Sequence, residues 1–149
     1  MQLKTTINMK SKDELLAKYN LEPGGKVQQV IDKSVIDQCE PYCPMLTGTL
    51  AKSAYGATHI GSGEVIYPGP YAHYQYYGEV YGPNIPIKDD NTGEITGYFS
   101  RPGIKKTPTG RQLEHRTDYN PLAGSFWFER AKADHLDDIV REAQNATKG

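Results

Sequence analysis

The sequence predicts an α+β fold in which N-terminal and C-terminal helices pack on a small, mostly antiparallel sheet, with a long protruding loop. Three observations lead to this prediction. Two segments, one in each half of the chain, carry apolar residues at the 3.6-residue period of a helix. Between them lie short segments rich in β-branched and aromatic residues, separated by turn sequences. The length of 149 residues suits one hydrophobic core, so we expect a single domain over residues 1–149 with an extended loop at about 82–120.

The N-terminal part is expected to contain two helices. Ser11 and Glu14 have the spacing of a capping box, which marks the start of a short helix that ends before Pro23. A second, amphipathic helix is expected over residues 26–38, because prolines at positions 41 and 44 prevent its continuation. Its buried face would consist of Val27, Val30, Ile31, Val35 and Ile36, and its outer face would contain Gln28, Gln29, Asp32 and Lys33.

The middle of the chain is expected to form two β-hairpins. Residues 53–60 and 64–67 would be the strands of the first hairpin, with the Gly-Ser-Gly turn at 61–63 between them. The second would run from residue 85 to residue 99 and turn at the Asp-Asn-Thr-Gly sequence of residues 90–93. Pro86 cannot donate a hydrogen bond to a neighbouring strand, so its strand is expected at the edge of a sheet.

No sustained periodicity follows between residues 100 and 124, where prolines and glycines interrupt the chain repeatedly. A loop of this length in a compact domain is usually functional or becomes ordered on binding a partner. Lys105, Lys106 and Arg111 make the segment basic and are candidates for contact with DNA or with an acidic partner. A solvated loop also accounts for three charges in seven residues, and both interpretations stay open.

The last helix is expected to begin near residue 125. Its apolar residues recur at positions i, i+3, i+4 and i+7, which indicates one buried stripe. Large aromatic side chains at its start would hold the helix against the sheet. A tight turn at residues 47–48 would direct Leu50 inward as a further core residue. The predicted core of these two regions comprises Leu50, Trp127, Phe128, Leu136, Ile139 and Val140.

Tyrosine dominates the aromatic residues, with eleven tyrosines against three phenylalanines and one tryptophan. An apolar ring with a polar tip suits half-buried surfaces such as subunit contacts, although it suits the wet face of a sheet equally well. Pro70 is expected to open a short helical turn that ends at Gly78. The tyrosines of this turn are candidate interface residues: Tyr71, Tyr74, Tyr76 and Tyr77.

Sequence motifs for catalysis or cofactor binding are missing, so we expect neither an enzyme nor a cofactor or metal site. The four histidines fall on different predicted elements. Cys39 and Cys43 suit reduced, packing cysteines, although a disulfide or a metal role stays open. The net charge of −1 excludes a protein that coats nucleic acid by charge alone. Without a signal peptide or a membrane-length apolar run, the protein is expected to stay in a reducing cytoplasm and away from membranes.

Three segments, in order, resemble one family of phage proteins. Residues 42–53 (YCPMLTGTLAKS) follow an amphipathic helix, residues 66–78 (IYPGPYAHYQYYG) follow a short strand, and residues 121–131 (PLAGSFWFERA) open the last helix. This order resembles the minor capsid and tail-completion, or head–tail joining, proteins of siphophages and prophages of Gram-positive bacteria. The resemblance covers roughly residues 27–140, with an apparent insertion at about 81–117.

The resemblance implies a non-enzymatic virion protein that is assembled in the host cytoplasm. Such a subunit would form a ring, hexameric or of another cyclic symmetry, at the head–tail junction or the top of the tail. Its partners would be further copies of itself and other neck, portal or tail proteins. DNA in the lumen is a further candidate for contact. Two alternatives come from other classes of protein: a nucleic-acid-binding module of a mobile element that uses the basic loop and tyrosine stacking, and a small hydrolase.

Overall fold

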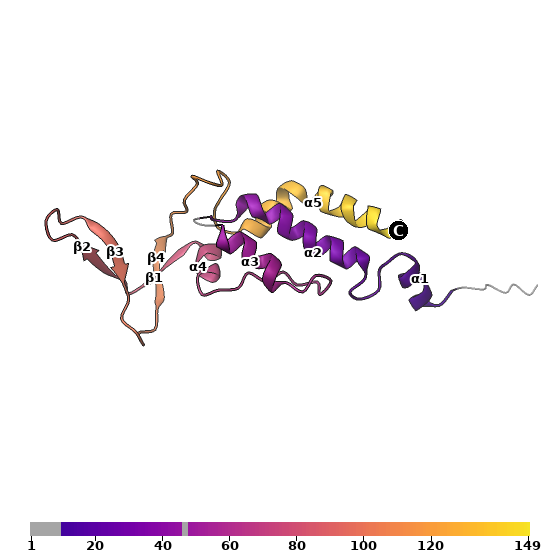
Figure 1. The fold of residues 1–149 in the computed structure, drawn as a ribbon, viewed down its shortest axis with the longest axis horizontal. Helices are drawn as coiled ribbons and strands as arrows, with labels where there is room; N and C mark the ends of the chain where they lie inside the picture. The colour runs from indigo at the N-terminus through magenta and orange to yellow at the C-terminus, as the bar shows by residue number, and fades with distance from the viewer. Residues whose placement is uncertain (1–9, 46–47) are drawn as a thin grey trace, which may run out of the picture.

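The computed structural model describes residues 10–45 and 48–149. The molecule is elongated, with most of its helices gathered in one body and a pair of strands at the far end (Figure 1). The predicted α+β class is confirmed, because helices lie near both ends of the chain and the strands between them pair antiparallel. In chain order the elements are α1 (Lys12–Lys18), α2 (Lys26–Cys39), the 3-10 turn η1 (Glu40–Tyr42), α3 (Thr49–Ala57), α4 (Ala72–Tyr77), β1 (Glu79–Gly82), β2 (Ile85–Lys88), β3 (Ile95–Phe99), β4 (Thr107–Gln112) and α5 (Trp127–Thr147).

The short helix α1 begins with the predicted capping box. The Glu14 backbone N–H donates to the Ser11 hydroxyl at 3.2 Å, and the Ser11 N–H donates to the Glu14 carboxylate at 3.1 Å. These bonds satisfy two backbone donors that the first turn leaves open. No residue of α1 is buried, and the Asn20 side chain that follows it donates to the Ala146 carbonyl at the end of α5. The segment after α1 is therefore fastened to the last turn of α5.

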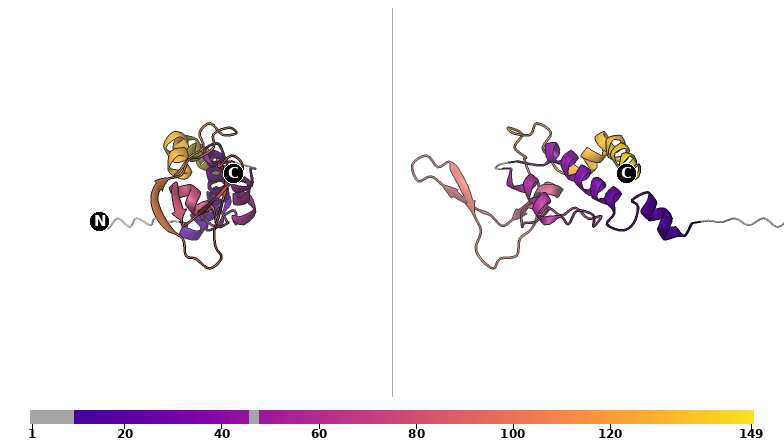
Figure 2. Two further views of the ribbon diagram at one scale, coloured as in Figure 1. Left: turned by 90° about the vertical axis from the view of Figure 1, so that its left-hand side faces the viewer. Right: turned by 45° about the vertical axis from the view of Figure 1, so that its right-hand side comes forward.

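The core lies where α2 and α5 run side by side, as both views of the body show (Figures 1 and 2). The buried cluster there also takes in η1 and the start of α3. It consists of Cys39, Tyr42, Cys43, Ala51, Trp127 and Ala131, with Val35, Met45, Leu50, Tyr67 and Tyr76 packed against it. Trp127 is the largest of these side chains and is only 1% exposed. No helix among the described residues has the length and apolar character that a membrane span requires.

The predicted core residues differ in how far they are buried. Val27, Trp127 and Ile139 are buried, and Leu50 packs against the core cluster. Val30 and Ile31 are half-buried. The prediction is wrong, for the single chain, for Phe128, Leu136 and Val140, which are 39%, 46% and 43% exposed. The reason is that α5 packs mainly on one helix, α2, so its buried face follows Trp127, Ala131 and Ile139 while the flank of the stripe stays open.

Asp32 departs from its predicted place on the outer face of α2. Its side chain is 2% exposed, and one carboxylate oxygen accepts the backbone N–H groups of Gly61 at 2.7 Å and Gly63 at 3.1 Å. The other oxygen accepts the Gln28 side-chain amide at 2.7 Å. Gly61 and Gly63 both have positive φ, which directs their N–H groups toward one acceptor. Asp32 thus fastens the turn at residues 61–63 to α2.

The first predicted hairpin is wrong, although its turn at residues 61–63 is present. Residues 53–57 belong to α3, because small side chains at Ala51 and Ala54 let that helix approach the core closely. Gly48 precedes α3 with a φ of 76°, in the left-handed region expected for a tight turn. Thr47, the other residue of that predicted turn, lies outside the described residues.

The second predicted hairpin is confirmed as β2 and β3, with Ile85 opposite Phe99 and Ile87 opposite Gly97. Its turn is held by the Asp89 carboxylate, which accepts the N–H groups of Asn91 at 2.8 Å and Thr92 at 3.0 Å. The segment predicted as an irregular loop after residue 100 contains a further strand, β4, which pairs with β1. All six residues of β4 are exposed, so no apolar alternation marks this strand in the sequence.

Candidate assembly surface

The strands form an arm, defined here as residues 79–113, that projects from the helical body (Figures 1 and 2). The arm leaves the body at Gly78, which ends α4 in the left-handed conformation with a φ of 65°. The Gly78 carbonyl accepts the N–H of Leu113 at 2.8 Å, so both ends of the arm meet at its base. A Cβ atom at position 78 would lie 1.9 Å from the Ser125 hydroxyl oxygen. A side chain at this position would strain the backbone and would require Ser125 to move.

Aromatic rings fix the base of the arm to the body. The Tyr76 ring lies edge-on to Trp127 with ring centroids 4.7 Å apart, and the Tyr77 ring lies edge-on to Phe126 with centroids 5.8 Å apart. The Phe126 N–H donates to the Tyr76 carbonyl at 2.9 Å, and the Tyr76 hydroxyl donates to the Glu129 carboxylate. On the other side, Tyr74 of α4 lies against Tyr81 of β1, with ring centroids 4.6 Å apart. The short helix α4 therefore connects the start of α5 to the arm.

The four predicted interface tyrosines lie in two different environments. Tyr74 and Tyr76 are half-buried and use their rings in the contacts that hold the arm. Tyr71 is 73% exposed, and Tyr77 is also exposed beside Phe126. An interface role for Tyr71 and Tyr77 stays a prediction, and their open rings suit one.

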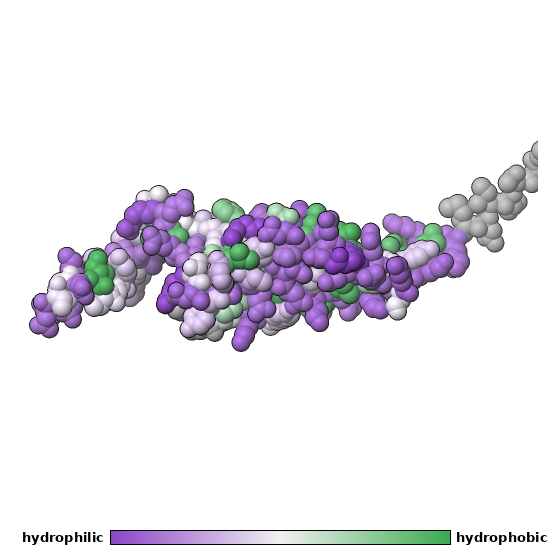
Figure 3. All heavy atoms as spheres, turned by 90° about the horizontal axis from the view of Figure 1, so that it is seen from above, coloured by the Kyte–Doolittle hydropathy of each residue, from purple (hydrophilic) through white to green (hydrophobic). Residues whose placement is uncertain are grey.

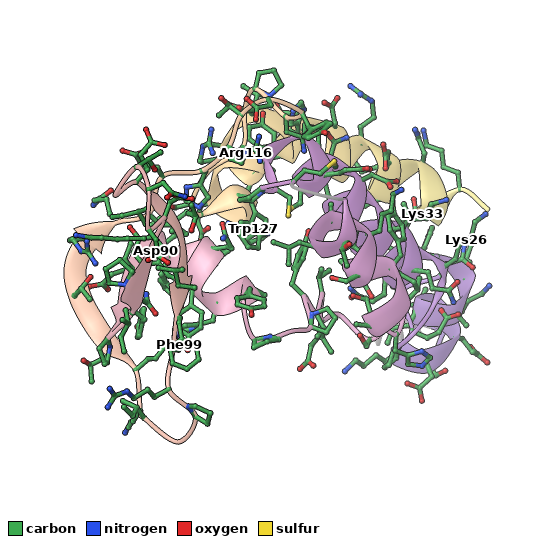
Figure 4. The ribbon with its side chains drawn as sticks, turned by 60° about the vertical axis from the view of Figure 1, so that its left-hand side comes forward. Lys26, Lys33, Asp90, Phe99, Arg116 and Trp127 are labelled. Carbon is green, nitrogen blue, oxygen red and sulfur yellow. The ribbon has the colours of Figure 1, made fainter. Side chains whose placement is uncertain are left out.

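The hairpin of β2 and β3 exposes apolar side chains on both faces. Every residue of the two strands is exposed except Gly97, which is half-exposed. Ile85, Ile87 and Phe99 share one face, and Tyr98 lies opposite Pro86 on the other. Figure 3 shows an apolar patch on this hairpin within a polar surface, and Figure 4 shows Phe99 on the strands away from α2 and α5. An isolated two-stranded hairpin is marginally stable in water, so this one is suited to covering by a partner.

The basic residues predicted to contact a partner follow β3 in the chain, within the arm. Lys105 and Lys106 precede β4, Arg111 lies within it, and all three are exposed together with Arg101. No acidic residue stands between Glu94 and Glu114 in the sequence. Within residues 10–45 and 48–149, none of these four cations takes part in an ion pair. We call residues 101–111 the basic segment.

The open flank of α5 forms a second exposed surface, which we call the outer strip. It consists of Glu129, Lys132, Ala133, Leu136, Asp137 and Val140. Ala133, Leu136 and Val140 lie three and four residues apart, so they share one face of the helix. Carboxylates border this apolar centre, and a shallow depression lies over it. Helical periodicity alone predicts Leu136 and Val140 in the core, so the sequence does not indicate this exposed surface.

A groove beside α3 contains a serine and a histidine, and both side chains contact backbone carbonyls. It has a volume of about 600 Å³ and lies between the start of α3, the segment before α4 and residues 114–116. The hydroxyl of Ser53 in this groove donates to the Leu50 carbonyl at 2.7 Å. The His115 ring contacts the Gln75 carbonyl at 2.9 Å through Nε2. The serine and the histidine are thus directed at backbone groups and not at each other, unlike a nucleophile and its base.

Both cysteines are free thiols in the core. Burial raises the pKa of Cys39 to about 11 and that of Cys43 to about 12, so both stay protonated near neutral pH. The described part of the chain contains no group of three or more side chains that could hold a metal ion. His135, for example, contacts the Tyr42 hydroxyl through Nε2 and the Asp138 carboxylate through Nδ1, both at 3.3 Å.

We expect neither thiol to react with Ellman's reagent at pH 8 in the folded protein, because the thiolate is the reactive form and both sulfurs are buried. Two equivalents of thiol per chain should react after unfolding in guanidinium chloride. The absorbance at 412 nm, with and without denaturant, measures both values. Rapid reaction of the native protein would contradict the packing role of these cysteines.

Comparison with known proteins gives one family. The model of a family described as minor capsid protein matches residues 3–147, nearly the whole chain. The comparisons with curated proteins and with solved structures give no match.

Proposed function

Because the chain belongs to the minor capsid protein family, it is a structural protein of the bacteriophage virion, and we propose that it forms a closed ring at the head–tail junction or at the top of the tail. The ring would be hexameric or of another cyclic symmetry. It would bind the adjoining portal, neck or tail proteins of the particle. Self-association and docking, without catalysis, would be its whole activity.

The observation that carries this proposal is the arm. Its hairpin of β2 and β3 exposes apolar side chains on both faces and contributes no residue to the core cluster of its own chain. Such a projection is expected where neighbouring subunits cover it. The arm lies at one end of an elongated molecule, so it would meet a different surface on the next copy (Figure 1). Contacts between two different surfaces generate rings when the rotation closes.

The groove supports the non-enzymatic part of the proposal. Its serine and histidine bind backbone carbonyls, and the two thiols are buried with a raised pKa. The serine and the histidine that a small hydrolase could use in this groove are therefore engaged in structural contacts.

Cryo-electron microscopy of the purified particle tests the position of the protein. We expect a ring of copies around the tail axis, identified by extra density when a small domain is fused after Gly149 at the exposed C-terminus. Particles that carry the unfused protein provide the matched control. Extra density scattered over the capsid faces, or present as a single copy, would overturn the proposed ring.

A further inference from the structure

We infer that the arm of one copy docks on the outer strip of α5 of the next copy, with the basic segment against the carboxylates and Ile104 against the apolar centre. This inference rests on the proposed ring, since it names the two surfaces through which the ring would close. It commits to a second copy of this chain as the partner of both surfaces.

The two surfaces have complementary charge. The basic segment carries four exposed cations and no acidic residue. The depression over the outer strip is lined by three carboxylates, those of Glu129, Asp134 and Asp137, and by one ammonium group, that of Lys132. Opposite potentials across an interface steer association and fix its register. The basic segment of one copy is therefore attracted to the strip of another copy, whereas two basic segments, or two strips, would repel each other.

The two surfaces also share an apolar component. Ile104 lies among the cations of the basic segment and is about half exposed, as are Leu136 and Val140 on the strip. Apolar centres with a charged rim are the usual composition of a subunit interface. The strip therefore offers the isoleucine of the arm an apolar surface to bury against.

The geometry favours a contact between different copies. The outer strip begins beside the base of the arm, where the Glu129 carboxylate accepts the Tyr76 hydroxyl, whereas the arm projects away from the body (Figures 1 and 2). The base of the arm is held by the aromatic contacts of Tyr76 and by the bond between Gly78 and Leu113. A contact of arm with arm would bring two basic segments together, which like charges oppose. The head-to-tail contact of arm with strip avoids this repulsion.

DNA in the lumen is the other partner that a basic segment could bind. Phosphate contacts would use the four cations but would leave Ile104 and the apolar centre of the strip in water. Docking on the strip covers both. The observations therefore favour a protein partner, and DNA becomes an outcome of the test.

Charge reversal tests the inference in infected cells. Lys105→Glu with Lys106→Glu is expected to lower the yield of infectious particles about tenfold or more, since like charges would then face each other. Adding Asp137→Lys should restore most of the yield. The matched control is Lys26→Glu with Lys33→Glu, the same charge change on the exposed side of α2, away from the arm (Figure 4). A normal yield for the first variant, or failure of Asp137→Lys to restore it, would overturn the inference.

A cross-link separates this inference from the proposed ring. In the variant Ile104→Cys with Leu136→Cys, mild oxidation of assembled particles should give a ladder of covalent oligomers on a non-reducing gel, and each single variant should give none. The buried native thiols do not interfere. A ring seen by microscopy without a ladder would overturn the docking alone, whereas the absence of any ring would overturn the proposed function. Cross-linking of the basic segment to packaged DNA without a ladder would assign that segment to DNA instead.

Discussion

A chain in which residues 85–99 are replaced by a short Gly-Ser linker is expected to fold normally and to give no assembled particles. The hairpin that this change removes buries no side chain in the body, so the helical core keeps all its contacts. Its ends are close enough for a short linker, because the Ser100 hydroxyl donates to the Asn84 side chain at 3.0 Å. What the change removes is apolar surface that we propose is covered by a neighbouring subunit.

Two measurements decide this prediction. The thermal unfolding midpoint of the purified variant should stay within a few degrees of the parent value. This corresponds to a change in the free energy of unfolding on the order of 1 kcal/mol or less. Complementation of a phage that lacks the gene should fail completely. The control replaces only the polar tip, residues 90–92, by another turn sequence, and should complement normally. Loss of cooperative unfolding would show that the hairpin belongs to the core, and normal complementation would show that it is dispensable.

Trp127→Ala is expected to destabilise the protein by about 3–5 kcal/mol, the range for truncating a large buried aromatic side chain. Trp127 is 1% exposed. Its ring centroid lies 5.3 Å from that of Tyr67 and 4.7 Å from that of Tyr76, and both are edge contacts. Its loss would open a cavity among Cys39, Ala131 and these rings. Because Tyr76 also fixes the arm, particle assembly should fail at temperatures where the variant still folds.

The neighbouring residue supplies a matched control. Phe128→Ala also removes an aromatic ring, one position along α5, where the side chain is 39% exposed. We expect a loss of about 1 kcal/mol or less, as for a surface substitution. Urea unfolding followed by circular dichroism measures both variants. Equal effects would mean that both rings are buried in the free subunit, as periodicity alone predicts, and would contradict the packing described above.

The sequence predicts the elements that carry a strong local signal. The period of α2 and α5, the capping box at Ser11 and the turn at residues 90–93 are all confirmed. Each depends on residues within a few positions of one another. Residues 53–57 belong to the helix α3 and not to a strand, and here the prediction overlooked a local signal, because the alanines of this segment favour a helix. Burial of Ala51 and Ala54 against distant residues adds to that preference.

Long-range partners account for the other differences. Asp32 is buried because Gly61 and Gly63, about thirty positions away, offer their N–H groups to its carboxylate. The strand β4 exists because β1 is beside it, and none of its exposed side chains signals this. Periodicity shows which residues of α5 share a stripe, but how much of that stripe is covered depends on how many helices pack against it. That number is a property of the fold.

The candidate surface was predicted in part. The basic residues lie exposed on the arm, and two of the four tyrosines are open. Tyr74 and Tyr76 serve contacts inside the chain, which composition cannot distinguish from contacts between chains. The apolar faces of the hairpin were missed as a site because alternating isoleucines are the ordinary signal of a half-buried strand. Only the structure shows that nothing in the described chain covers them.

The prolines of the arm also affect the behaviour of free subunits. An exposed strand edge normally offers a row of backbone donors and acceptors on which other chains can add strands and aggregate. Here β2 contains Pro86 and β4 contains Pro108, neither of which has an N–H, and each ladder has an irregular register. Each proline removes one backbone donor from its strand, which disfavours the addition of a further strand to β2 or β4. We therefore expect free subunits to resist edge-to-edge polymerisation at β2 and β4 while their apolar hairpins stay exposed.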